Sequence, residues 1–467
     1  MDIAAECQQL QRCIEQAVCD FHRDADVNRL LLRLRTLLMA FVEQLAVAVI
    51  EHRLQQPGFL ADLKARAAKS AFRFKGFKAT SICLLTGRSF SIHSPYFARA
   101  APKNRRGRKR KKRTAKTGCH LGLSHMGLLD RCSAVAASAA AQAAVLCPSF
   151  DIARQMLSSF GLKMNVKTIQ RLCRHIGDSA IEHRHRIALS DADTAAKRIL
   201  MATLDGGRLR ERRAKRGRRP AGLKRQGYHT DWKEPTQLVI QWIDEDGTKS
   251  HDIAPIYDAT MADTDRAFEL MEAYLRQLDC TQADIVVFCA DGARRYWSRF
   301  QSLAKRLKLP AHIEVIDYTH AKQNLNEILD RLPSKLQAKE RADIVKHCYN
   351  LLWQGDISAL GQQIRLHIKG RKKRKKALAK FKSYFLDNYR RMQYAAFKNL
   401  KLPTGSGCVE SAIRRVINLR LKSPGIFWKR KTAEVMLFLR STLLCGRWKI
   451  MLDNLLALNR GELAQCP

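Results

Sequence analysis

Apolar positions in the first 190 residues repeat mostly at helical spacing. The longest stripe consists of Leu30, Leu34, Leu38, Phe41 and Leu45. Its spacing of three and four residues predicts an amphipathic helix within a helical region spanning 1–70. Such a stripe packs either on the core of its own chain or on a second copy in a dimer, and both interpretations stay open. Residues 71–98 alternate instead around Thr86-Gly87, which predicts a small β-hairpin.

A second helical block, from about 121 to 190, contains two short helical patterns separated by a turn. We expect helices at 151–160 and 166–176, with 161–165 between them. This spacing is typical of a helix-turn-helix, although a generic helical hairpin has the same pattern. Apolar residues form the inward stripe of the second helix, so its outward face would read the major groove of DNA. That face consists of Lys167, Thr168, Gln170, Arg171 and Arg174.

From residue 199 the pattern changes to short apolar runs that alternate with helical segments. The expected strands are 199–204, 238–243, 251–257, 285–290 and 313–316, and the expected helices begin near 263 and 296. The order βββαβαβ predicts a mixed sheet with helices packed against it. Residues 319–400 show helical periodicity only, and a last helix opens after Thr404-Gly405-Ser406-Gly407.

The charge balance points to a polyanionic partner. The 467 residues include 85 Lys and Arg against 43 Asp and Glu, a formal net charge of +42. Such an excess repels itself unless a polyanion neutralises it, so we expect binding to double-stranded DNA. Most of the excess lies in three tracts, 103–116, 208–225 and 369–380, and the first has no apolar periodicity, as in a linker. Its densest part, which we expect to contact DNA unless it is merely a solvated charge run, is Arg108, Lys109, Arg110, Lys111, Lys112 and Arg113.

Several other classes of protein fit the sequence poorly. The first residues lack the basic start of a secretory signal, and the apolar run 134–147 is too short to span a bilayer. We therefore expect a cytoplasmic protein without membrane contact, whose thiols are kept reduced. Cys119, His120, His125 and Cys132 match the spacing of no zinc module.

Three acidic residues stand at positions suited to chemistry. Asp205 and Asp291 each follow an apolar strand and precede a glycine, and Glu410 lies in the first turn of the last helix. Carboxyl ends of strands border the ligand crevice of an open α/β sheet. Two Asp and one Glu together form a site for Mg²⁺ or Mn²⁺, whereas each acid alone could be a helix cap or turn former. With the βββαβαβ order and the helical insertion, this placement describes a ribonuclease H-like core.

Five separated motifs resemble the DDE transposases of bacterial insertion sequences, in particular the Kra-type group related to Mutator-like transposases. They are DGGRLR from Asp205, YHTDWKEP at 228–235, ADGARRYW at 290–297, DYTHA at 317–321 and the long stretch 402–428. The resemblance implies that Asp205, Asp291 and Glu410 are the catalytic acids. It also implies that Asp317 to His320 is the short (Cys/Asp)xxHis motif of the family.

The resemblance further implies metal-dependent cleavage and strand transfer of DNA. Two divalent ions about 3.5 to 4 Å apart would hold the attacking and leaving oxygens, with Asp205 bridging both. His320 would position the scissile strand or simply pack at a helix start. The expected partners are the ends of the element, target DNA and further copies of the chain, in the nucleoid of a bacterial cytoplasm. The alternatives are an inactive DNA-binding protein derived from a mobile element and another two-metal DNA nuclease.

Together these patterns predict a domain organisation. It comprises a helical N-terminal region with a hairpin (1–100), a basic linker (101–118), a helical DNA-binding block (119–194, helix-turn-helix at 151–177), the first part of the core (195–317), a helical insertion (318–403), the C-terminal helices of the core (404–445) and a tail (446–467).

Overall fold

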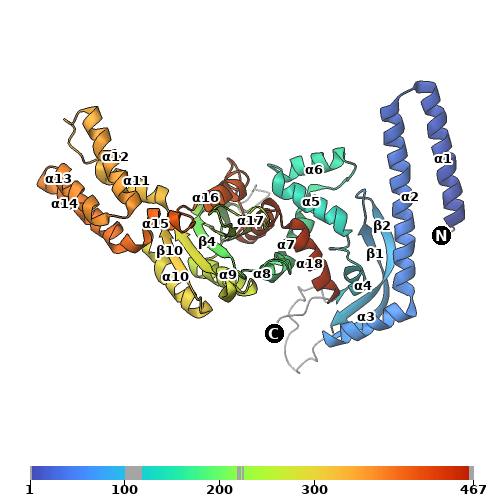
Figure 1. The fold of residues 1–467 in the computed structure, drawn as a ribbon. Coiled ribbons are helices and arrows are strands. Elements are labelled where there is room, and N and C mark those ends of the chain that lie inside the picture. The colour runs from blue at the N-terminus through green and yellow to red at the C-terminus, as the bar shows by residue number, and fades with distance from the viewer. Residues whose placement is uncertain (1–2, 100–117, 218–221, 223–225, 462–467) are drawn as a thin grey trace. The chain divides into compact units, whose positions relative to one another are not determined.

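The computed structural model describes residues 3–99, 118–217, 222 and 226–461 (Figure 1). The chain folds into two compact units. The first comprises Met1–Ser179 and Asp453–Pro467, and the second Ala180–Leu452. The division falls inside a helix, whereas the sequence analysis placed the start of the core at residue 195.

The first unit begins with three helices, as the periodicity of residues 1–70 predicted. They are α1 (Ile3–Asp24), α2 (Val27–Gln55) and α3 (Pro57–Lys69), and α1 and α2 lie side by side (Figure 1). Asp26 caps α2 by accepting a hydrogen bond from the Arg29 amide at 3.1 Å. The predicted stripe on α2 is half-buried, except for Leu38, which is 46% exposed. The interpretation of α2 as a dimerisation helix therefore stays open.

The predicted hairpin is present and is braced by α2. It consists of β1 (Phe72–Cys83) and β2 (Ser89–Arg99), with the short β3 (Gly118–Cys119) beside β2. Glu43 of α2 is fully buried, and its carboxylate accepts hydrogen bonds from the amides of Leu85 and Thr86, both at 2.7 Å. This contact fixes the turn of the hairpin on the helix.

Helices fill the rest of the first unit. They are α4 (Leu121–His125), α5 (Ala134–Leu146), α6 (Phe150–Ser159) and α7 (Val166–Ile181), with α7 and the later α18 (Trp448–Arg460) continuing across the boundary between the units. Helices α6 and α7 coincide with the expected pair. The side chain of Ser149 caps α6, and that of Asn165 accepts a hydrogen bond from the Thr168 amide at 2.8 Å. The two helices are confirmed, whereas their use as a helix-turn-helix is left as a proposal.

A five-stranded mixed sheet forms the centre of the second unit. Its order is β10-β9-β4-β7-β8, in which β4, β9 and β10 are parallel and β7 is antiparallel to both β4 and β8. The strands are β4 (Ile199–Gly206), β7 (Thr236–Ile243), β8 (Ile256–Thr260), β9 (Ile285–Ala290) and β10 (His312–Ile316). This arrangement confirms the mixed sheet and is compatible with a ribonuclease H-like core. The strand expected at 251–257 is wrong in position, because 251–255 form no strand and β8 begins at Ile256.

A two-stranded ribbon between β4 and β7 was not predicted. It consists of β5 (Leu209–Ala214) and β6 (Tyr228–Lys233). Arginines dominate β5, and four of its six positions are at least partly exposed, so no apolar alternation marked it as a strand. The Arg212 amide donates to the Trp428 carbonyl at 2.8 Å, and the Trp428 amide donates to the Arg210 carbonyl at 2.9 Å. These two bonds tie the ribbon to the C-terminal part of the unit.

The remaining helices surround the sheet, and the helices of the insertion extend from one side of it (Figure 1). The short α8 (Arg184–Ile187) precedes β4, and α9 (Thr264–Gln277) and α10 (Arg294–Leu307) connect the later strands. The predicted insertion is helical and consists of α11 (Tyr318–Leu329), α12 (Ala338–Gln354), α13 (Ile357–His367), α14 (Arg371–Tyr384) and α15 (Tyr394–Asn399). One apolar core joins sheet residues such as Phe288 to insertion residues such as Leu352.

The last helices return to the sheet. Helix α16 (Gly407–Ile413) continues as a π-helical turn, η3 (Arg414–Asn418), and packs against β4 and β7, while α17 (Arg430–Leu444) packs against β8. Among the described residues, no helix is both long and apolar enough to cross a bilayer.

Candidate functional site

Asp205 and Asp291 lie at the same carboxyl edge of the sheet. Strands β4 and β9 are parallel, their pairing ends at Thr203 and Cys289, and each acid follows two residues later. The charge of Asp291 helps to raise the pKa of Asp205, so the two carboxyl groups are near each other. Asp205 accepts a hydrogen bond from the Gly206 amide at 2.6 Å, and Asp291 accepts one from the Ala293 amide at 3.0 Å. Both side chains keep oxygen lone pairs free for a ligand.

Close packing explains why a glycine follows Asp291. A Cβ atom at Gly292 would lie 2.1 Å from the ring of Tyr384, at the end of α14. A larger residue would therefore displace the ring of Tyr384. The insertion thus packs closely on the loop that carries Asp291.

Glu410 and His320 approach the same edge from two helices. Glu410 lies in the first turn of α16 and His320 in the first turn of α11. Their side chains meet, with Nε2 of His320 3.4 Å from Oε1 of Glu410. Residues 90 positions apart thus form one pair of polar side chains.

Asp317 holds these two helices together, a role that the sequence analysis missed. It is 2% exposed and caps α11 by accepting a hydrogen bond from the His320 amide at 2.9 Å. Its other oxygen accepts bonds from the amide and from the hydroxyl of Ser406, the latter at 2.8 Å. The Tyr318 amide also donates to the Thr404 carbonyl at 3.0 Å. Asp317 therefore fixes His320 relative to Glu410 without itself facing the site.

The four predicted active-site residues share one electrostatic environment. The pKa of Asp205 is raised, first by burial and then by the negative charges of Asp291 and Glu410. The Gly206 amide and His320 oppose this rise. Among the described residues, neither Lys nor Arg forms an ion pair with any of the three acids. The site thus concentrates negative charge that no lysine or arginine of the described chain neutralises through an ion pair.

This set of donors suits a hard divalent cation such as Mg²⁺ or Mn²⁺, which prefers anionic oxygen ligands. The uncompensated charge on Asp205 is the structural reason to expect a cation there. In the part of the chain that the structure describes, however, no three His, Cys, Asp or Glu side chains are already arranged as metal ligands. The acids are close enough to influence one another, but they do not form a closed coordination shell.

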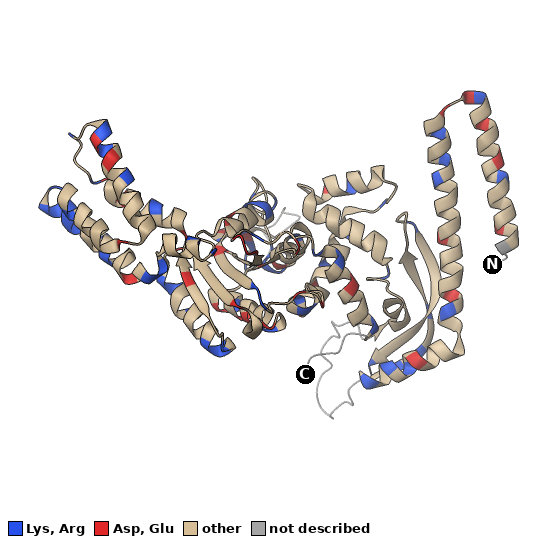
Figure 2. Cartoon of the chain, in the orientation of Figure 1, with Lys and Arg blue, Asp and Glu red and all other residues tan. Residues whose placement is uncertain are grey.

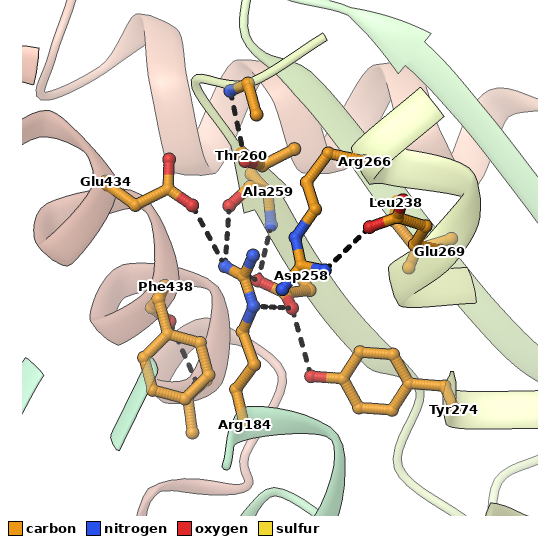
Figure 3. A network of polar contacts seen from close by, with 12 residues as sticks. Arg184, Leu238, Asp258, Ala259, Thr260, Arg266, Glu269, Tyr274, Glu434 and Phe438 are labelled. Carbon is orange, nitrogen blue, oxygen red and sulfur yellow. Dashed lines mark hydrogen bonds and ion pairs between the residues drawn. The ribbon is translucent and has the colours of Figure 1, made fainter. Parts of the chain in front are cut away.

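A second group of acids in the same unit is built differently (Figure 3). Arg184 of α8, which is 2% exposed, forms ion pairs with Asp258 of β8 at 3.3 Å and with Glu434 of α17 at 3.1 Å. Glu434 also accepts a hydrogen bond from the Met261 amide at 2.6 Å, and the Tyr274 hydroxyl donates to Asp258 at 3.1 Å. Glu434, the obvious substitute for Glu410 as third acid, is thus occupied in holding α17 to the sheet.

The proposed DNA-reading face of α7 is partly exposed. Ile169, Leu172 and Ile176 are fully buried, as the inward stripe required. On the outward face Lys167, Arg171 and Arg174 are exposed, while Thr168 and Gln170 are intermediate. Arg171 forms an ion pair with Asp130 at 2.6 Å, which holds its guanidinium in one place. The side chains face outward together, as the periodicity predicted.

The basic tracts differ in their surroundings. Arg108, Lys109, Arg110, Lys111, Lys112 and Arg113 lie outside the described residues. The third tract begins α14, where residues 371–376 are all basic and all exposed (Figure 2). Part of the second tract lies on the β5–β6 ribbon, where the Arg210 guanidinium stands 4.6 Å from the ring centre of Phe427. The ribbon also exposes Trp232 by 54%, so this surface is both basic and aromatic.

Comparisons with known proteins give little beyond this geometry. No family model and no curated protein matches the chain. Among solved structures, one that matches is described as a "Drosophila P element transposase strand transfer complex", with 14% sequence identity over 69% of this chain and 81% of that chain, and a TM-score of 0.26. A likeness this slight carries no argument, so the function has to be argued from the residues of the site.

Proposed function

We propose that this protein is a DNA transposase that cuts and joins the strands of a bacterial insertion sequence. The observation that carries the proposal is the electrostatic influence of Asp291, Glu410 and His320 on Asp205, in a region where no described lysine or arginine forms an ion pair with the acids. The five sequence motifs that resemble bacterial DDE transposases support it. Four of these motifs supply the acids, His320 or Asp317.

In this proposal each residue of the site has a distinct task. Asp205, Asp291 and Glu410 would hold divalent cations, which when bound supply the positive charge that phosphodiester transfer needs. The imidazole of His320, 3.4 Å from Glu410, would donate a hydrogen bond to an oxygen of the scissile strand. Asp317 would keep that imidazole in place through its bonds to the His320 amide and to Ser406. No serine or cysteine nucleophile is required.

DNA binding would involve both units. The exposed face of α7 would read the ends of the element, while the tracts 103–116, 208–225 and 369–380 would bind phosphates. Binding should therefore weaken steeply with salt, because each neutralised phosphate contributes about −0.9 to the log–log slope. A transposition complex also needs two ends, so we propose that copies of the chain assemble on DNA.

The experiment that tests the function uses the DNA flanking the coding sequence as donor ends. Purified full-length protein is incubated with supercoiled donor and a separate target plasmid in Mg²⁺. We expect cleavage at the ends of the element and joining of the freed 3′ hydroxyls to the target. Cleavage without joining would support another nuclease, and binding without cleavage would support an inactive DNA-binding protein.

The reading role of α7 has its own test. Gln170→Ala should weaken binding to the element's end more than binding to random DNA, because a base contact contributes about 1 to 3 kcal/mol of discrimination. Arg154→Ala is the matched control, since Arg154 lies on the neighbouring helix and pairs with Asp151 in its own first turn. Neutralising Arg108 to Arg113 should instead weaken both DNAs alike. Equal losses for Gln170→Ala on both DNAs would exclude α7 as the reader.

A further inference from the structure

Two cysteines of the first unit face each other across a backbone pairing. Cys83 ends β1, and its amide donates to the Arg131 carbonyl at 2.9 Å, while its carbonyl accepts from the Ser133 amide at 2.8 Å. Cys83 and Cys132 are therefore bridge partners in parallel orientation. Paired residues on neighbouring strands lie about 4.8 Å apart, within the Cα separation of about 4.4 to 6.8 Å that a disulfide requires. The two thiols are close enough for each to influence the ionisation of the other.

A strained turn holds Cys132 in this position. Leu129 and Cys132 exchange backbone hydrogen bonds at 2.8 and 2.9 Å, with Asp130 and Arg131 as the two central residues. Both central residues have positive φ, 46° and 66°, a conformation that residues other than glycine rarely adopt. The ion pair of Asp130 with Arg171 stabilises this turn against that strain. Strain of this kind is concentrated at functional sites.

Cys83 borders a cavity, whereas Cys132 does not. A polar cavity of about 290 Å³ opens beside Cys83 and is lined by Asp130, Arg131, Lys163 and Arg171 among others. Cys132 does not line this cavity and is 1% exposed. A small polar oxidant would therefore meet Cys83 first.

The surroundings also distinguish the chemistry of the two thiols. The hydrogen bond from Cys132 lowers the pKa of Cys83, and Arg171 lowers it further, against burial and the charge of Glu43. The same hydrogen bond, together with burial, raises the pKa of Cys132 far above its ordinary value. A half-buried thiol with a lowered pKa beside a second, buried thiol is the arrangement of reactive dithiol sites.

We propose that Cys83 and Cys132 form a peroxide-sensitive dithiol. The Cys83 thiolate attacks one oxygen of hydrogen peroxide, the O–O bond breaks, and hydroxide leaves and takes up a proton as Cys83 becomes a sulfenic acid. The Cys132 sulfur then attacks the Cys83 sulfur, a disulfide forms, and the sulfenic oxygen leaves as water with the proton of Cys132. In total two thiols are oxidised and one peroxide is reduced to two waters. The proposal does not depend on the proposed transposase activity.

The test is peptide mapping of the full-length protein after brief treatment with hydrogen peroxide and quenching by alkylation. We expect a peptide that contains Cys83 joined to Cys132, and loss of free Cys83 at least about tenfold faster than loss of free Cys348. Cys348 is the internal reference, because burial raises its pKa to about 11. Equal rates at Cys83 and Cys348, or oxidation of Cys83 without the linked peptide, would overturn the proposal.

Variants separate the two roles. In Cys132→Ala, Cys83 should stop at the sulfenic acid, which a dimedone-type probe traps, while in Cys83→Ala, Cys132 should stay reduced. Cys348→Ala is the matched control and should still form the Cys83–Cys132 link. Should Cys132→Ala fail to fold, Cys83→Ala and the mapping of the unaltered chain decide the question. Oxidation of Cys132 in Cys83→Ala at the rate seen in the unaltered chain would contradict the assigned order.

Discussion

Two groups of acids in the second unit show how the same residue types serve different ends. Asp258 and Glu434 enclose Arg184, and every partner in that network comes from the protein itself (Figure 3). Asp205, Asp291 and Glu410, which we call the open group, also lie at the sheet. Within the described chain, however, no lysine or arginine forms an ion pair with them. Even Arg295, whose pKa Asp291 helps to raise, donates its hydrogen bond to the Tyr296 hydroxyl.

The difference separates acids that stabilise the fold from acids kept for a ligand. Burial lowers the pKa of Arg184, but Asp258 and Glu434 outweigh it and raise that pKa, so the buried cation stays charged. At the other group burial, and after it the charges of Asp291 and Glu410, raise the pKa of Asp205, so the folded protein tolerates an unfavourable charge there. Perturbed acids in an open position are typical of functional sites, whereas a satisfied buried pair is typical of structure.

The largest expected effect is a loss of protein stability when the network of Arg184, Asp258 and Glu434 is broken. Arg184→Met should lower the free energy of unfolding by about 3 to 5 kcal/mol, because it leaves two carboxylates without their buried cation. Urea denaturation measures the change. Arg266→Ala is the matched control, since its ion pair with Glu269 is exposed and should contribute less than about 1 kcal/mol. Equal losses in the two variants would mean that the buried network is not structural.

Substitutions in the open group should lower catalytic activity and not the stability of the protein. Asp205→Asn, Asp291→Asn and Glu410→Gln should each lower donor cleavage at least about 10²- to 10³-fold, the effect of removing one electrostatic group from an active site. DNA binding, measured by gel shift on the same preparations, should persist. Glu434→Gln is the opposite control and should cut normally under conditions where it is folded. Normal cleavage by Glu410→Gln would remove Glu410 from the site.

The acids of the open group could be predicted from the sequence, whereas the Arg184 network could not. Asp205 and Asp291 each follow an apolar strand and precede glycine, so a local pattern places them at the sheet edge. Arg184 and Glu434 are 250 positions apart, and nothing near either residue signals the other. The role of Asp317 was missed for the same reason, because its partner Ser406 lies 89 positions away. The succession of strands and helices along the chain could be predicted from apolar runs, whereas the basic β5–β6 ribbon could not, because its residues show no apolar alternation.

A smaller effect is expected at the edge of the open group. His320→Ala should slow donor cleavage about 10- to 100-fold, the loss of one hydrogen bond to a charged group. Affinity for Mg²⁺, measured by calorimetry, should change less than in Asp205→Asn, because His320 is assigned to the DNA strand. Thr319→Ala changes the exposed neighbouring residue and serves as control. A loss of Mg²⁺ affinity equal to that of Asp205→Asn would place His320 among the metal ligands instead.

The smallest effect concerns the stability of the open group itself. In the absence of divalent cations at pH 7, Asp205→Asn should raise the melting temperature by about 2 to 4 °C, the shift that roughly 1 kcal/mol produces in a domain of 150 to 250 residues. The reason is that burial and two neighbouring carboxylates disfavour the ionised form of Asp205 in the folded protein. Removing that charge relieves the repulsion, whereas removing a charge from the Arg184 network creates an imbalance.

The stability gained by Asp205→Asn should depend on pH. The pKa of Asp205 is raised in the folded state, so its protonated form stabilises the fold. This stabilisation is fully present at a pH below the pKa of the unfolded state, about 3.9, and is lost as the pH rises through the pKa of the folded state. The advantage of Asp205→Asn should therefore be small near pH 3.5 and reach its full size by neutral pH. Added Mg²⁺ should reverse the order at pH 7, because an ion that binds the folded wild-type site stabilises it, whereas the variant binds the ion more weakly. A variant that keeps its advantage in excess Mg²⁺ would show that the open group takes up no cation.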